Sequence, residues 1–132
     1  MLRTYRRLQG VLTEVYAHPS RSPKAVERYA WGGARSEIYK TVFRYRQQHI
    51  KLTGAPKVSP RVTAVDDKRG VARIVDCFDD SKWIPVDART GKSLAVSGQN
   101  HRYEVTAQAR QVEGRWYVVS LTPDREQTCS PR

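Results

Sequence analysis

The strongest constraint on the fold is a change in hydrophobic spacing near Gly54 and Pro56. Before this point, apolar residues recur at steps of three and four residues, which is typical of amphipathic helices. After it, apolar and polar residues alternate, which is typical of half-buried strands. The sequence therefore predicts an α+β fold in which N-terminal helices precede a sheet.

The first part of the chain predicts three helices. The first covers residues 2–17 and stops at His18-Pro19, because proline disfavours helical backbone in the residue before it. A short second helix runs from residue 24 to about residue 30 and is broken by Gly32-Gly33. The third helix runs from residue 34 to about residue 49. These helices can cover one face of a sheet.

The second part predicts about five antiparallel strands. Pro85 places its strand at an edge or a bulge, because proline has no N–H to donate within a central strand. The last strand is apolar on both faces, so we expect it at the centre of the sheet. The predicted strands are 61–65, 71–78, 83–86, 102–112 and 115–122. The expected architecture is a single domain, 1–132, with helices at about 2–49, a curved sheet at about 58–122 and a polar tail, 123–132.

The other segments are arranged around residues 71–87. This stretch predicts two strands folded about a short acidic turn, Asp79-Asp80-Ser81, because aspartate and serine are common turn residues. Alternation along the first strand places Asp76 and Phe78 on one face and Cys77 on the other. The stretch therefore contains both a candidate catalytic carboxylate and a candidate disulfide partner.

The two cysteines, Cys77 and Cys129, leave two alternatives open. A disulfide between them would tether the tail to the sheet and would require an oxidising compartment. Otherwise Cys77 is a buried strand residue and Cys129 an unpaired tail residue. Neither cysteine has metal-ligand spacing with the three histidines, so we expect no metal. The chain has no glycine-rich phosphate loop, and we expect no cofactor.

The charge is strongly basic, with 24 Lys and Arg against 13 Asp and Glu, a net charge of +11. This excess favours anionic partners such as nucleic acid, acidic lipid or an acidic envelope polymer. The alternative is that arginine only keeps the protein in solution, since the basic residues are spread along the chain. An anion-binding surface would require convergence of Arg3, Arg6, Arg7, Arg44, Arg46, Lys51 and Arg61.

Asp76, Asp79 and Asp80 are the best candidates for a catalytic group, and the strand face of Asp76 would point it into a pocket. A carboxyl desolvated in a pocket has a raised pKa and can accept a proton. Tyr39, Tyr103 or His101 could then donate a hydrogen bond to an oxyanion. The alternative, which we favour, is that Asp76 pairs with a nearby arginine and that Asp79 and Asp80 only form the turn. Because no nucleophile elbow and no locally supported Cys/His pair is present, the sequence argues against an enzyme.

Four stretches carry a resemblance to a known superfamily: VYAHPSRSPKAVERYA, VARIVDCFDDSKW, DARTGK, and GRWYVVSL followed by a late cysteine. With the order of helices and strands, they resemble the nuclear transport factor two-like superfamily, also called the cystatin-like or cone fold. Within it, the chain is most similar to small actinobacterial exported proteins and lipoproteins. The resemblance implies a cone-shaped roll, a Cys77–Cys129 disulfide, a pocket between helices and sheet, and an export signal or membrane tether upstream of Met1.

Three functional hypotheses follow. The preferred one is a non-catalytic exported accessory or assembly domain that binds a protein partner or anionic polymer at the cell envelope, as in a conjugation or secretion apparatus. The second is a small-molecule binder or acid–base enzyme of the isomerase or cyclase kind that uses Asp76 in a pocket. The third is a DNA-binding or other anionic-polymer-binding protein. Dimers are common in this superfamily, and the sheet face would be the interface. No apolar run in the sequence reaches the roughly 18 residues of a membrane span.

Overall fold

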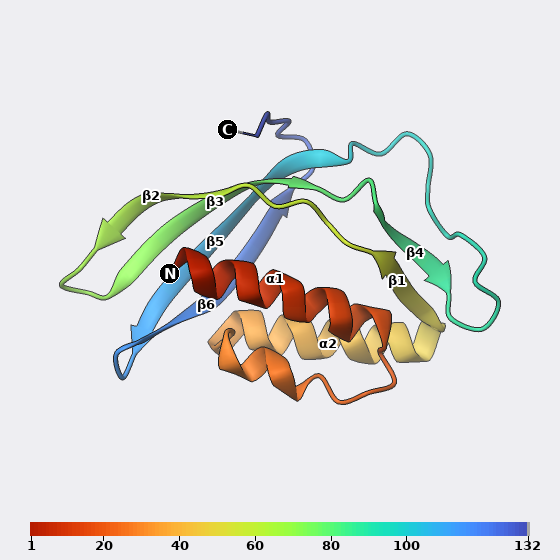
Figure 1. The fold of residues 1–132 in the computed structure, drawn as a ribbon, viewed down its shortest axis with the longest axis horizontal. Helices are drawn as coiled ribbons and strands as arrows, with labels where there is room; N and C mark the ends of the chain where they lie inside the picture. Colours follow the sequence, from red (N-terminus) through yellow and green to blue (C-terminus); the bar gives the residue numbers. More distant parts are fainter. Residues whose placement is uncertain (132) are drawn as a thin grey trace.

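Two α-helices lie on the concave side of a curved antiparallel sheet in the computed structural model, which describes residues 1–131 (Figure 1). A short 3-10 helix, η1, connects them. The helices and strands, in chain order, are α1 (Leu2–Ala17), η1 (Lys24–Arg28), α2 (Gly32–Gln48), β1 (Ile50–Gly54), β2 (Pro60–Asp66), β3 (Val71–Asp79), β4 (Trp83–Asp87), β5 (Arg102–Val112) and β6 (Arg115–Asp124). The predicted α+β class with a curved antiparallel sheet is confirmed.

The second of the three predicted helices is not an α-helix. Residues Lys24–Arg28 form only a 3-10 turn, and the backbone beyond it becomes extended. Trp31 N donates to Val118 O at 2.9 Å, and Val118 N donates to Tyr29 O at 2.8 Å. This short parallel contact with β6 fixes the backbone away from helical geometry. Gly32 then begins α2 with a φ of 55°, so the glycine pair starts a helix rather than breaking one.

The strands form two antiparallel sheets, which lie on either side of a bend. A four-stranded sheet has the order β2-β3-β5-β6, and a two-stranded sheet pairs β1 with β4. The pairing of β1 with β4 and the pairing of β2 with β3 follow almost the same antiparallel register. Ile50 pairs with Asp87, Lys57 with Asp79, and Asp66 with Val71. The predicted fold-back about the acidic turn is therefore wrong, because β4 continues past the bend and pairs with β1. Strand β1, which sequence reasoning missed, supplies that partner.

Strand β6 is an edge strand of the sheet, contrary to the prediction that it is central. A register shift in the pairing of β5 with β6 explains its apolar pattern. Ala109 pairs with Val118, whereas Ala107 pairs with Leu121. The extra residue turns both Val118 and Leu121 toward the side of the buried alanines. The two apolar faces inferred from strict alternation are therefore largely one face.

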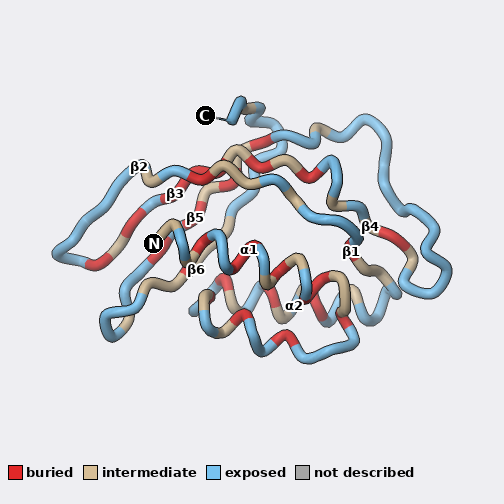
Figure 2. Tube along the Cα trace, viewed as in Figure 1, coloured by how far each residue is buried: buried red, intermediate tan, exposed pale blue. Residues whose placement is uncertain are grey.

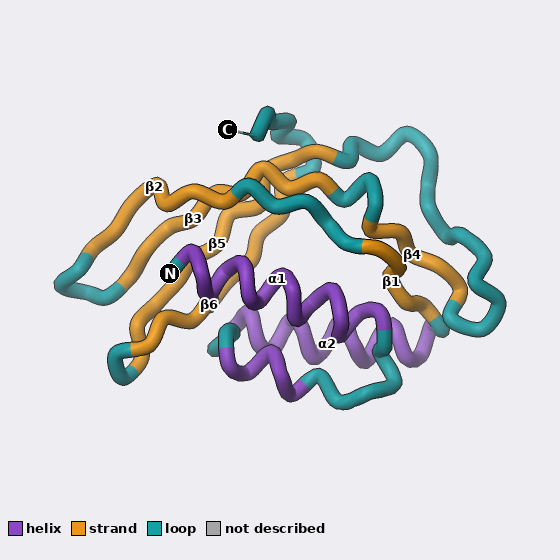
Figure 3. Tube along the Cα trace, viewed as in Figure 1, coloured by secondary structure: helices purple, strands orange, loops and turns teal. Residues whose placement is uncertain are grey.

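The core lies between the helices and the inner face of the sheet (Figure 2). Leu8 and Ile38 from the helices pack with Ile74 of β3, and Ala107 of β5 leaves room for close approach. The loop between β4 and β5 and the tail after β6 lie outside regular structure (Figure 3). Among residues 1–131, no helix is long and apolar enough to cross a membrane.

Candidate functional site

Asp76 is fully buried on the inner face of β3, where it belongs to a hydrogen-bond network with α1. Tyr5 Oη donates to Asp76 Oδ2 at 2.5 Å, and Ser59 N donates to Asp76 Oδ1 at 2.6 Å. Gln9 Nε2 donates to Tyr5 Oη at 3.2 Å. Burial raises the pKa of Asp76, and the hydrogen bonds from Tyr5 and Ser59 oppose that shift. Burial and the nearby Asp76 charge raise the pKa of Tyr5.

This hydrogen-bond network has a structural role, because it joins α1 to β3. Asp76 faces inward, as alternation predicted, but its hydrogen-bonding partner is Tyr5 rather than an arginine. Tyr39 lies elsewhere and donates to Glu27. Asp76 does not line any of the cavities described below. The four candidate catalytic residues are therefore not assembled in one place, because His101 and Tyr103 gather around a different carboxylate.

That carboxylate is Asp80, at the bend between β3 and β4. Its Oδ1 lies 2.8 Å from His101 Nδ1, and its Oδ2 accepts hydrogen bonds from Tyr103 Oη at 3.0 Å and from Arg125 Nη2 at 2.8 Å. The Arg125 guanidinium carbon also lies 4.5 Å from the Tyr103 ring centre. Burial, followed by the Asp80 charge, raises the pKa of Tyr103. We call these four residues the Asp80 cluster.

Sequence reasoning missed one member of this cluster, Arg125, and weighed Asp80 both as a chemical candidate and as a turn residue. The sequence pattern places Arg125 in the polar tail, where nothing marks it as functional. The signal that could have linked Asp80 to His101 is strand register: Phe78 pairs with Tyr103, and two residues further along both strands Asp80 meets His101. No local spacing indicates Arg125, which is 45 residues from Asp80 in sequence.

A cavity of about 310 Å³ lies beside the Asp80 cluster. Rings of Tyr45 and Trp83 join Tyr103 in its wall, and Leu52 and Ile84 add aliphatic surface. The Trp83 indole Nε1 is buried and has no hydrogen-bond partner among residues 1–131. The exposed tryptophan of the protein is Trp31, at 42%. Trp83 is half-buried and packs against Tyr16 and Phe78.

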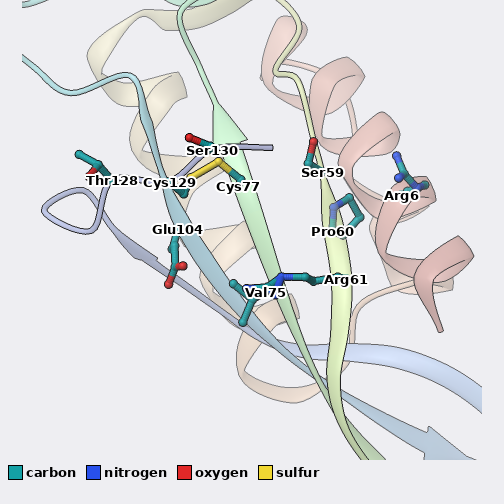
Figure 4. Close-up of a pocket in the computed structure, with 10 residues that line it drawn as sticks. All are labelled: Arg6, Ser59, Pro60, Arg61, Val75, Cys77, Glu104, Thr128, Cys129 and Ser130. Atoms are coloured by element: carbon teal, nitrogen blue, oxygen red, sulfur yellow. A yellow bond between two sulfur atoms is a disulfide. The ribbon is translucent and has the colours of Figure 1, made fainter. Parts of the chain in front are cut away.

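The Cys77–Cys129 disulfide is present, as the resemblance implied. It joins the tail to β3 across a sequence separation of 52 residues (Figure 4). A second cavity of about 260 Å³ adjoins it, with Arg6 approaching from α1 and Arg61 from β2 (Figure 4). Glu104 also lines this cavity, so its walls contain both charges.

The seven candidate anion-binding residues do not gather around any one of these cavities. The cavity beside the disulfide is lined by Arg6 and Arg61, whereas a cavity at the C-terminal end of α2 is lined by Arg46 and Lys51. The Arg46 guanidinium donates to the backbone oxygens of Pro19 and Arg21, which gives it a structural role. The remaining candidates are Arg3 and Arg7, exposed on α1, and Arg44, whose guanidinium carbon lies 5.9 Å from the Tyr45 ring centre.

Comparison with known proteins adds a fold relationship. No family model and no curated protein matches the chain. Among solved structures, the chain is similar to the intermembrane space region of the chloroplast protein ARC6, with a TM-score of 0.51 and 8% sequence identity over 92% of this chain and 94% of that one. At this identity the likeness concerns the fold alone. Membership of the nuclear transport factor two-like superfamily stays a prediction from the sequence motifs.

Proposed function

We propose that this chain is a non-catalytic, extracytoplasmic domain that binds a partner at the cell envelope as an accessory or assembly module. The observation that carries the proposal is the disulfide between Cys77 and Cys129. Such bonds persist in oxidising compartments and are rare where glutathione and thioredoxin keep thiols reduced. The resemblance to the nuclear transport factor two-like superfamily makes conjugation and secretion machines the first assemblies in which to seek the partner.

The absence of a catalytic role is supported by the position of Asp76. Its two carboxylate oxygens already accept hydrogen bonds from Tyr5 and Ser59, and its side chain is fully buried. A general base must come within hydrogen-bond reach of the proton that it removes. A carboxylate enclosed in this way stabilises the contact between helix and sheet.

The outer face of the sheet is the proposed partner surface. Arg61, Arg73 and Arg110 are exposed on the side of the strands opposite to the core, where alternation also places Gln108. Three cations on one face favour an acidic protein surface or an anionic polymer. A homodimer through the same face is the competing arrangement, and like charge on both copies would oppose it.

Site-specific photo-crosslinking in the producing cells tests this proposal. A photoreactive residue replaces Gln108 on the outer face, and a matched variant carries it at Gln47, which is exposed at the end of α2. The proposal predicts a discrete crosslinked partner in the envelope fraction for position 108 and none for position 47. Recovery of the protein only from the cytosol, or equal crosslinking at both positions, would contradict it.

A further inference from the structure

We propose that the cavity beside the Asp80 cluster is a binding site for a small aromatic carboxylate. Its volume of about 310 Å³ falls at the lower end of the range found for small-molecule sites. It combines an apolar, ring-lined part with a small number of convergent polar groups, which is the composition that such sites share. The inference does not depend on the proposed envelope function, since it concerns a different part of the surface.

The apolar part of the cavity is suited to a flat ring. Tyr45, Trp83 and Tyr103 reach it from α2, β4 and β5, and Leu52 and Ile84 come from β1 and β4. Aromatic side chains pack with other rings in offset or edge-to-face arrangements that contribute beyond the area they bury. A fused two-ring system therefore fits this wall better than a flexible chain of equal volume, because it loses less conformational freedom on binding.

The polar part of the cavity offers hydrogen-bond donors. The Asp80 oxygens are already used by His101, Tyr103 and Arg125. Arg125 also donates from Nη1 to Asn100 O at 2.9 Å, yet a guanidinium has five N–H donors and these two contacts leave others available. His101 uses Nδ1 toward Asp80, so its Nε2 is the nitrogen that a ligand can meet. A ligand carboxylate can accept hydrogen bonds from these donors. A cationic ligand would find the Asp80 oxygens already paired with other groups.

The buried Trp83 N–H strengthens the preference for a ligand with an acceptor. This donor has no partner among residues 1–131, and a polar group buried without a partner disfavours the folded state. A small rotation of the indole toward the cavity would let a ligand oxygen accept from Nε1. The ligand would then satisfy a donor that no group of residues 1–131 accepts from.

A surface loop forms one wall of the cavity and supplies a route of entry. Ala95 and Gln99 line the cavity from the segment between β4 and β5. The start of that segment is held to β4, because Leu94 N donates to Pro85 O at 2.8 Å. Residues 95–99 are exposed, so they can move without disturbing the paired strands.

The test follows the indole N–H signals of the ¹⁵N-labelled, disulfide-intact chain by NMR during titration with 2-naphthoate. Single Trp→Phe variants assign the signals of Trp31, Trp83 and Trp116. The proposal predicts a saturable downfield shift of the Trp83 indole proton and no comparable shift of the other two. The cationic control 2-naphthylmethylamine, which has the same rings, should bind at least about tenfold more weakly, a difference of about 1.4 kcal/mol.

Two variants make the result specific to the cavity. Ala95→Phe adds bulk from the exposed loop without adding an indole N–H, and should abolish the naphthoate shift while the remaining spectrum stays unchanged. Arg125→Gln keeps a polar side chain but removes the cation, and should weaken naphthoate about tenfold or more. An unmoved Trp83 signal up to about 10 mM naphthoate would overturn the proposal. Equal binding of acid and amine would also overturn it, since the cavity would then recognise only apolar surface.

Discussion

Tyr5 Oη donates a hydrogen bond to Asp76 Oδ2 at 2.5 Å, and both side chains are fully buried. The contact joins α1 to β3 across 71 residues of sequence. Ser59 N occupies the other carboxylate oxygen. Asp76 therefore fixes the first helix to an inner strand of the sheet.

Tyr5→Phe should destabilise the fold by about 2 kcal/mol, because it leaves a buried carboxylate with one hydrogen bond fewer. Asp76→Asn should cost a similar amount. The double variant should lose about 1 kcal/mol less than the sum of the two single changes, since the residues act through one contact. Urea unfolding at neutral pH measures all three free energies. Additive costs would show that Tyr5 and Asp76 act independently.

The raised pKa of Asp76 predicts a pH dependence of stability. The folded state holds the Asp76 proton more tightly than the unfolded chain, in which the pKa is near the ordinary 3.8. The contribution of Asp76 to stability must therefore fall as the pH rises from about 3.8 to the folded-state value, and level off above it. Asp79 and Asp87 have lowered pKa values and act in the opposite direction, so the comparison must isolate Asp76.

The isolating comparison is the difference in unfolding free energy between the wild-type protein and Asp76→Asn, measured at several acidic pH values. The wild-type protein should lose unfolding free energy relative to Asp76→Asn as the pH rises through that interval. A difference that stays constant or moves in favour of the wild type would mean that the folded state does not raise the pKa of Asp76.

Loss of the disulfide should lower the unfolding free energy by about 4 kcal/mol, the chain-entropy expectation for a loop of this size. Paired Cys77→Ser and Cys129→Ser changes, or reductant, should have the same effect. Thermal and urea unfolding with and without reductant give the measurement. Ser130→Ala, beside the bond but outside it, serves as the matched control and should change little. A reduced protein as stable as the oxidised one would contradict a structural role for the bond.

Charge reversal should locate the partner surface. Arg73→Glu with Arg110→Glu changes the outer sheet face, and Arg3→Glu with Arg7→Glu makes an equal change on α1. The first pair should reduce the yield of the crosslink from position 108 severalfold, and added salt should reduce the wild-type yield as well. If the α1 pair alone removes the crosslink, the helix face is the binding surface.

The elements with strong periodicity were predictable from the sequence, and the elements set by tertiary contacts were not. Helix α1 shows its buried stripe at Tyr5, Leu8 and Leu12, and β3 alternates clearly. In contrast, β1 has only five residues and directly follows a helix, so its identity depends on β4 lying opposite. The bulge in β6 depends on the pairing with β5, and alternation alone assigns Leu121 to the wrong face.

The candidate site was predictable only in part, for the same reason. The inward orientation of Asp76 follows from alternation, and the disulfide followed from the resemblance. The hydrogen-bond partner of Asp76 was not predictable, because Tyr5 is 71 residues away and has the spacing of an ordinary apolar helix position. The Asp80 cluster required both the β3–β5 register and the path of the tail that brings Arg125 to the bend.

The most direct test of the central claim is the redox state of Cys77 and Cys129 in the cells that make this protein. Rapid acid quenching, thiol alkylation and intact mass measurement, with and without prior reduction, report that state. The account predicts that neither cysteine is alkylated unless reductant is added first, because the protein resides in an oxidising compartment. Alkylation of both cysteines without reductant would show free thiols in the cell and would contradict an extracytoplasmic role.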